Sequence, residues 1–229
     1  MQSPAARVLA EALTGQFEDH HAFLCRTLLD SIDFLSGQID ALTERTTQAV
    51  EQLPCPDPSG GSRPGAGANL VAKLVTIPGV GVRIAQMLLA ELGPDMTVFP
   101  TADHLVSWAK FAPRTVQSGG KNTSGPTGKG NPWIEGAIGE AALSASRSNT
   151  FLGARYKRIV KRRGRKRALV AVGHSLLVIV WHLLNEPETP YTDLGCDYHQ
   201  HLVDPTCRTR DLVRRLKALG HDVTLAPAA

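Results

Sequence analysis

The sequence has few cysteines and no long apolar run, and both shortages exclude classes of protein. Its four cysteines are scattered over 229 residues and no cleavable apolar signal opens the chain, so we expect free thiols in a reducing cytoplasm rather than a disulfide-bonded secreted protein. The most apolar segment, residues 168–184, falls short of the roughly 20 apolar residues that a bilayer requires, and Ser175 interrupts it. We therefore predict a buried core helix there and no membrane partner.

Strand patterns are also missing, since no segment alternates apolar and polar residues cleanly and no internal repeat is visible. Apolar residues recur at helical spacing, which predicts a mainly α fold: a long N-terminal coiled-coil helix, then a helical domain with a helix-hairpin-helix and a glycine-rich catalytic loop. The predicted parts are a coiled-coil helix (1–53), a linker (54–69), a catalytic-serine domain (70–186) and a tail with a short helix (187–229). Beyond the hairpin, helices are expected over about 101–112, 132–148, 151–163, 166–185 and 206–220.

The N-terminal segment carries a heptad seam with an acidic outer surface. Leu28, Ile32, Leu35, Ile39 and Leu42 are spaced alternately four and three residues apart, which is typical of a coiled coil. We favour assembly between chains, as a dimer or tetramer, over a helix packed on its own domain. The prolines and glycines that follow predict a flexible linker.

Residues 70–93, "LVAKLVTIPGVGVRIAQMLLAELG", place a Pro-Gly-x-Gly turn between two apolar helices. Pro78 would end the first helix, while Gly79 and Gly81 would permit a tight turn whose N–H groups face a phosphate at the start of the next helix. This pattern is typical of a helix-hairpin-helix that holds the DNA backbone without reading its sequence. A plain helical turn could use the same residues.

The run from Arg155 to Arg167, "RYKRIVKRRGRKR", contains nine cations and no acid. A polyanion is the natural partner of so dense a run. The residues that we assign to DNA binding are Arg158, Lys161, Arg162, Arg163, Arg165 and Lys166. The alternative is a solvated helix face, but without a polyanion these cations would repel one another.

Residues 111–133, "FAPRTVQSGGKNTSGPTGKGNPW", are either a disordered spacer or a loop that comes close to an anion. We favour the loop, because an apolar helix containing Trp133, Ile134 and Ile138 follows at once and would hold it in place. Ser118 precedes two glycines in a segment rich in lysine. A hydroxyl on unencumbered backbone in a positive field suits a nucleophile that attacks a phosphodiester, although Ser-Gly-Gly is also a common linker tripeptide.

The order "IPGVG…LLAELG…HLVSWAKFAPRTVQSGGK…GKGNPWIEGAIGEAA" resembles the C-terminal domain of insertion-sequence transposases of the one-hundred-ten family, over residues 70–200 or so. The "GKGN" of residues 128–131 matches the family's turn before the next helix, and "YTDLGCDYH" is similar to its usual ending. These RNA-guided recombinases pair a ribonuclease-H-like domain, which bears a DEDD carboxylate set, with a catalytic-serine domain through a coiled coil.

The resemblance implies that Ser118 is the nucleophile of DNA strand cleavage and exchange. The residues that it implies in DNA binding here are Arg114, Gly119, Gly120, Lys121, Lys129 and Asn131. No DEDD set lies in these residues, so we expect this chain to bind no metal itself and Mg²⁺ to reside in a DEDD domain supplied elsewhere. The implied partners are DNA, a guide RNA and further copies of the chain, in the nucleoid of the cytoplasm.

Other functions stay open beside the transposase. One is a non-enzymatic DNA-binding protein or a defective copy that regulates an intact transposase, and another is an RNA-binding accessory protein. A zinc site is not expected, because the spacing of Cys196, His199, His201 and Cys207 fits no common one. His174 and His182 lie on the apolar helix, where we expect satisfied core histidines rather than a general base.

Overall fold

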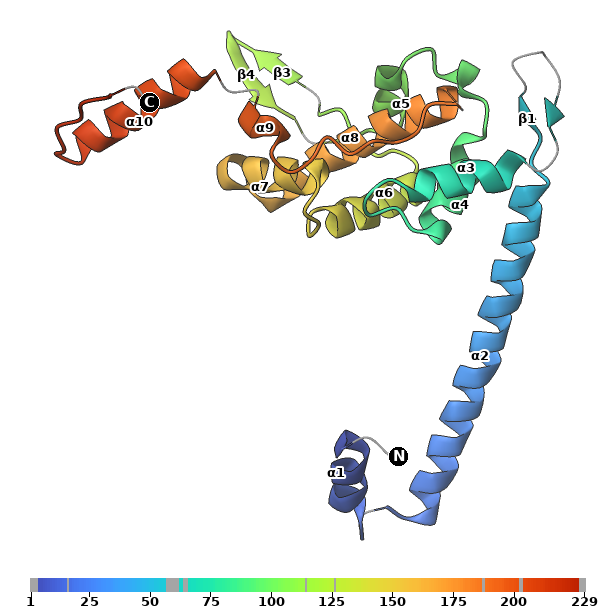
Figure 1. Ribbon diagram of the computed structural model, residues 1–229. Helices are drawn as coiled ribbons and strands as arrows, with labels where there is room; N and C mark the ends of the chain where they lie inside the picture. The colour runs from blue at the N-terminus through green and yellow to red at the C-terminus, as the bar shows by residue number, and fades with distance from the viewer. Residues whose placement is uncertain are drawn as a thin grey trace. The chain divides into compact units, whose positions relative to one another are not determined.

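The predicted mainly α architecture is confirmed in the computed structural model (Figure 1). The structure describes residues 4–15, 17–56, 62–63, 66–113, 115–125, 127–186, 188–201 and 204–226. The chain divides into two compact units, Met1–Ala49 and Val50–Ala229.

The first unit is built from α1 (Pro4–Leu13) and the N-terminal part of α2 (Asp19–Glu51). Hydroxyl side chains along α2 donate to backbone carbonyls one turn earlier, for example Thr43 Oγ1 to Ile39 O at 2.8 Å, which satisfies them without a partner outside the helix. The heptad seam of α2 is exposed, with Ile39 at 62% and Leu42 at 67% of their full accessible area. An apolar seam so exposed is a surface that another helix could cover.

The second unit is a helical domain with most of its core around α8 (Arg165–Asn185). Helices α3 (Ala66–Val75), α5 (Ala102–Trp108), α6 (Pro132–Ala145) and α7 (Phe151–Arg163) all pack against α8. The remaining elements are α4 (Val82–Leu92), the short 3₁₀ helix η1 (Met96–Val98), α9 (Tyr198–His201) and α10 (Pro205–Ala218).

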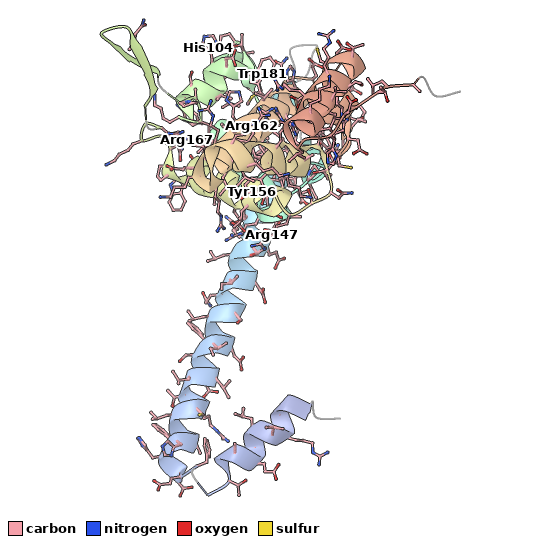
Figure 2. All side chains as sticks on the ribbon, turned by 90° about the vertical axis from the view of Figure 1, so that its left-hand side faces the viewer. His104, Arg147, Tyr156, Arg162, Arg167 and Trp181 are labelled. Atoms are coloured by element: carbon pink, nitrogen blue, oxygen red, sulfur yellow. The ribbon has the colours of Figure 1, made fainter. Side chains whose placement is uncertain are left out.

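Helix α8 is the core helix that the sequence predicts. By length and composition it could cross a membrane, yet Val172, Leu176 and Leu177 have no accessible surface because the neighbouring helices cover them. Trp181, labelled in Figure 2, adds a hydrogen bond between α8 and the residues that precede α5, since its Nε1 donates to Phe99 O at 2.8 Å. Lys73 of α3 also bonds to this helix. Its Nζ donates to Leu183 O at 2.9 Å and to Glu186 O at 2.6 Å, and so satisfies carbonyls at the C-terminal end of α8.

Local chemistry explains where these helices begin and end. Thr101 and Thr150 accept backbone N–H groups at the starts of α5 and α7, as N-cap hydroxyls do. Gly164 has φ +80°, a left-handed conformation that glycine adopts without strain, and it separates α7 from α8. The basic run therefore occupies a corner between two helices rather than one continuous helix.

Part of the predicted linker, residues 54–69, has regular secondary structure. Short strands β1 (Cys55–Pro56) and β2 (Ser62–Arg63) pair antiparallel, and α3 begins at Ala66 rather than Leu70. Gly67 lies in this helix, and a Cβ there would lie 1.9 Å from Val50 O. A glycine that suggests flexibility in the sequence is therefore one that permits a close approach to Val50.

Candidate functional site

The glycine-rich segment forms a β-hairpin, where the sequence predicts a loop without strands. Strand β3 (Thr115–Ser118) pairs antiparallel with β4 (Lys121–Ser124), and Ser118 is opposite Lys121. Between them Gly119 (φ +55°) and Gly120 (φ +77°) form a two-residue turn, and positive φ at both positions is the signature of the type I′ hairpin turn. The conformation of this turn is thus sufficient to explain why both positions are glycine.

Ser118 therefore occupies the last position before the tip of this hairpin. In Figures 1 and 2 the two strands project from the helices as an arm. A Cβ added at Gly119 or Gly120 would meet nothing within 4 Å, so the backbone beside Ser118 is open to a large partner. Arg114, which the sequence assigns to DNA binding, lies outside the described residues.

The C-terminal side of the hairpin is fixed to the helical domain by Gly130 and Asn131. A Cβ at Gly130 would lie 2.7 Å from Ala109 O, so only glycine fits this close passage. Asn131 Oδ1 accepts the N–H groups of Trp133 (2.9 Å) and Ile134 (3.3 Å), and its Nδ2 donates to Glu91 Oε2 at 2.5 Å. Asn131 is the N-cap of α6, which gives it a structural role that the sequence interpretation did not foresee.

A cleft of about 680 Å³ lies between the base of the hairpin and the α7–α8 corner. Its cations are Arg155 and Arg163 of α7 and Lys166 and Arg167 of α8, and none of the described residues that line it is acidic. The other lining residues are Phe111, Pro113, Gly125, Thr127, Ile159, Val170, Ala171 and His174. The cleft thus joins a cationic rim to an apolar floor beside the arm that carries Ser118.

Arg155 is the least hydrated cation of this cleft. It is half-buried, and its Nε is buried without a hydrogen-bond partner in the described structure. Burial, and then the nearby charge of Arg158, lower the pKa of Arg155, but a guanidinium stays protonated at neutral pH. A buried donor without an acceptor is costly, so Arg155 is held beside the cleft at an energetic cost.

The structure divides the basic run into two groups. Arg163 and Lys166, which the sequence assigns to DNA binding, line the cleft. Arg155 and Arg167 line it too, although the sequence interpretation did not assign them to DNA binding. Arg158, Lys161, Arg162 and Arg165 are exposed and do not line the cleft; Figure 2 labels Arg162 and Arg167 on the two helices.

The predicted helix-hairpin-helix is α3, a turn and α4, and its two glycines differ in their surroundings. Gly79 has φ +91°, and a Cβ there would lie 2.4 Å from Ala141 O and 2.8 Å from Ala145 N of α6. Gly81 has φ −90° and open space around it, at the N-cap of α4. Gly79 therefore serves the packing of the turn on α6, while Gly81 is the glycine that leaves the start of α4 accessible.

The segment "YTDLGCDYH" holds the N-terminal end of α7, a role that sequence reasoning missed. Asp193 accepts the N–H groups of Phe151 (3.2 Å) and Gly195 (3.0 Å) and the hydroxyl of Tyr191 (3.1 Å). Burial, and then the charge of Asp193, raise the pKa of Tyr191, so the phenol remains a donor. An Asp two residues before a Gly was the available signal, since such carboxylates bond nearby backbone N–H groups.

His199 of α9 packs on the same end of α7, with its ring 5.1 Å from that of Phe151. Burial, and then the charges of Arg158 and Arg155, lower the pKa of His199. No group of three or more His, Cys, Asp or Glu side chains in the described part of the chain is arranged to hold a metal. The sequence predicts that His174 and His182 are core histidines. For His182 this is wrong, because its side chain is exposed. His174 lines the cleft.

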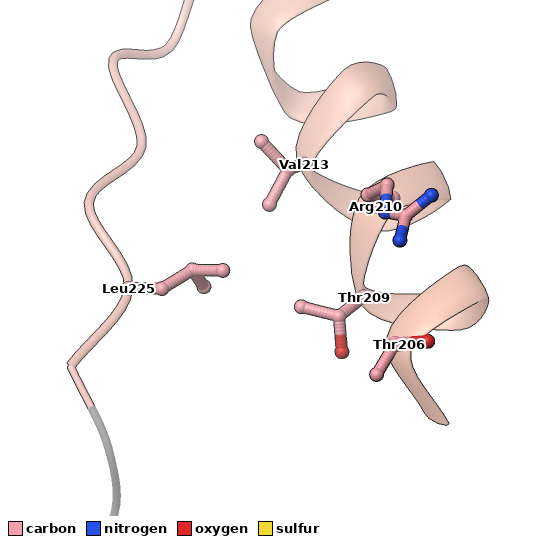
Figure 3. A pocket seen from close by; sticks show the side chains of 5 residues that line it. All are labelled: Thr206, Thr209, Arg210, Val213 and Leu225. Carbon is pink, nitrogen blue, oxygen red and sulfur yellow. The ribbon is translucent and has the colours of Figure 1, made fainter. Parts of the chain in front are cut away.

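Two further hollows lie outside the cleft. Trp133, at the start of the apolar helix α6, is 63% exposed and borders a hollow of about 330 Å³ beside Ile84 and Met87. Another hollow, on α10, is lined by Thr206, Thr209, Arg210, Val213 and Leu225 (Figure 3). Neither includes a residue that the sequence assigns to the site.

Comparisons with known proteins connect this geometry to a family. Residues 71–157 match the model described as Transposase IS116/IS110/IS902 family. The matched residues run from α3 through the Ser118 hairpin into α7 and include Arg155, whereas Arg163, Lys166 and Arg167 follow them.

A curated relative is similar over a short stretch. The insertion element IS110 uncharacterized 43.6 kDa protein of Streptomyces coelicolor is 56% identical to this chain over 46 residues. The stretch covers 20% of this chain and 11% of that relative. The similarity thus supports the same family over a limited region.

Proposed function

We propose that this chain is the serine-bearing, DNA-binding part of an insertion-sequence transposase. The observation that carries the proposal is the position of Ser118, at the tip of a projecting hairpin whose base borders a cationic cleft, within the residues that match a transposase family model. A nucleophile that attacks a phosphodiester needs an approachable hydroxyl and nearby positive charge. We propose that the hairpin presents the Ser118 hydroxyl to DNA and that Lys121, its partner in the strand pairing, adds positive charge at the tip.

In the proposed step the Ser118 hydroxyl oxygen attacks the phosphorus of a DNA phosphodiester. A Ser–O–P bond forms, the bond from phosphorus to the leaving deoxyribose oxygen breaks, the serine proton passes to solvent or a base, and the leaving oxygen takes up a proton. Attack by a free DNA hydroxyl on the phosphoserine reverses these bonds and joins the new strand. Cations such as Lys121, which is opposite Ser118 in the hairpin, would stabilise the charge on the phosphoryl oxygens.

The metal of such a reaction is proposed to reside in another domain. The described residues include no group of three or more His, Cys, Asp or Glu side chains that could hold a metal ion. A DEDD domain, fused or on a separate chain, would supply it. Guide RNA is proposed as a further partner, and the exposed seam of α2 is proposed to join copies of the chain.

The experiment is a trap for the covalent intermediate. The chain is combined with a DEDD domain, Mg²⁺, guide RNA and substrate DNA, the mixture is denatured, and the residue that carries DNA is mapped by mass spectrometry. Ser118→Ala should abolish the adduct and leave DNA binding nearly intact, because one neutral hydroxyl contributes only about 1 kcal/mol.

Ser124 is the matched control for this test. It lies in the same hairpin but pairs with Thr115, at the end remote from the tip, so Ser124→Ala should leave the adduct in place. An adduct that survives Ser118→Ala would overturn the assignment of the nucleophile. No adduct from the wild-type assembly would favour the non-enzymatic DNA-binding protein.

A further inference from the structure

The cleft at the α7–α8 corner has a floor that contact with a duplex backbone does not require. Phosphates of a duplex are held by cations and N–H donors at a surface. Here Phe111, Ile159 and Val170 line a hollow behind those cations. Gly173 makes room for this floor, since a Cβ there would lie 2.5 Å from the Phe111 ring.

The dimensions and chemistry of the cleft suit a nucleotide whose base is not paired. Its volume of about 680 Å³ is within the range of roughly 300–1,000 Å³ that is usual for small-molecule sites. An unpaired base offers two flat apolar faces and polar edges, and its phosphates offer the negative charge that the rim lacks. A paired base cannot enter, because its faces are stacked and its edge is bonded to the other strand.

Arg155 favours the same kind of ligand. It lines the cleft from α7 and is half-buried, so its charge is the least hydrated one there. A guanidinium carries five N–H donors in a planar fork, and phosphate oxygens or the carbonyl oxygen of a base can accept from such donors. Arg163 and Lys166 lie farther along the run, where they could hold the flanking phosphates.

We propose that this cleft binds an unpaired nucleotide of single-stranded DNA, with the base against the apolar floor and the phosphates on the cationic rim. The proposal rests on DNA being the substrate, as in the proposed function. It adds that the chain distinguishes strands that are open from strands that are paired. In strand exchange such a site would hold the displaced nucleotide next to the hairpin.

The test measures binding of the full chain to three DNA probes by fluorescence anisotropy: a single strand, a perfect duplex, and that duplex with one unpaired 2-aminopurine. Ala171→Trp fills the floor from α8. It should weaken binding to the single strand and the bulged duplex by about tenfold, in line with the energy of one base stacked on a protein surface, and leave the perfect duplex within about twofold. The fluorescence of 2-aminopurine should change on binding in the wild-type chain and not in the variant.

Two arginine variants distinguish binding in the cleft from non-specific attraction of DNA to positive charge. Arg155→Met keeps the stem of a cleft residue, and it should weaken the unpaired probes more than the duplex. Arg162→Met removes an exposed charge of α7 outside the cleft, and it should weaken all three probes alike. Equal weakening of every probe by Arg155→Met, or full single-strand affinity in Ala171→Trp, would overturn the proposal.

The outcomes also separate this inference from the proposed function. If the three probes bind equally tightly and the Ser118 adduct still forms, only the cleft assignment is wrong. If no probe binds, DNA as the substrate is wrong and the cleft assignment with it. Thermal unfolding of each variant checks that it is folded, and Arg155→Met remains informative if Ala171→Trp does not fold.

Discussion

Replacement of Gly79 by alanine should destabilise the helical domain, because this glycine is confined in both conformation and space. Its φ of +91° belongs to the left-handed region, where a residue with a Cβ is disfavoured by roughly 1–2 kcal/mol. The added Cβ would also lie 2.4 Å from Ala141 O and 2.8 Å from Ala145 N. Both are backbone atoms of a buried helix, so no flexible side chain can move aside.

The two costs add because they arise from different interactions. Overpacking at a close approach costs about 1–3 kcal/mol, so the total is about 2–5 kcal/mol. A domain of ordinary stability has only about 5–15 kcal/mol in all. Gly79→Ala should therefore lower the unfolding temperature by about 4–20 °C, at the 2–4 °C per kcal/mol expected for this size, and thermal or urea unfolding would measure it.

Gly81 is the matched control, two residues away in the same turn. Its φ of −90° is accessible to alanine, and an added Cβ would meet nothing within 4 Å, so Gly81→Ala should cost less than about 1 kcal/mol. If Gly79→Ala unfolds like the wild type, the close packing of this turn on α6 is refuted, and Gly79 would again be a candidate for binding phosphate. If only Gly81→Ala weakens DNA binding, the phosphate is bound at the start of α4.

Three further predictions concern assembly, charge and the end of α7. Ile32→Asp with Ile39→Asp places charge in the exposed seam of α2, at a cost of several kcal/mol when unpaired, so light scattering should report a smaller particle; a monomeric wild type would refute the seam as an interface. Neutralising Arg163 and Lys166 should flatten the salt dependence of DNA binding by roughly 0.9 in logarithmic slope for each phosphate that the variant no longer neutralises, and an unchanged slope would place the bound phosphates elsewhere on the protein. Asp193→Ala removes the acceptor of two N–H groups and of the Tyr191 hydroxyl and should cost about 1–3 kcal/mol in urea unfolding, whereas Asp193→Asn, which keeps one acceptor oxygen, should cost less.

Helices were predictable here because local signals mark them. The expected helix over 151–163 coincides with α7, whose start is capped by Thr150 and whose end is set by Gly164. The long apolar helix was also visible in the pattern of apolar residues. The signals that start and end these helices lie within a few residues of the helix ends, so the sequence alone is enough to predict them.

The hairpin could not be foreseen from apolar alternation, because its strands are short and polar. Residues 115–118 and 121–124 contain a single aliphatic side chain, Val116. The usable signal was the Gly-Gly pair between two segments of equal length, which favours a type I′ turn. In α6, by contrast, the helical phase was readable from the sequence, because the buried stripe runs through Ile134, Ile138 and Ala141 and the exposed Trp133 lies off that stripe.

The cleft depends on a change of chain direction within the basic run, which the number of charges in the run does not reveal. In a continuous helix the spacing of Arg155, Arg163 and Arg167 would distribute their charges along a single rod. The left-handed Gly164 ends α7 and lets α8 begin in a new direction, so cations on two helices line one hollow. Mutual repulsion among those cations is then strongest where the floor is least hydrated, and an anion bound there relieves it. The arrangement that is least favourable without a ligand is therefore the one best suited to hold a phosphate beside the Ser118 hairpin.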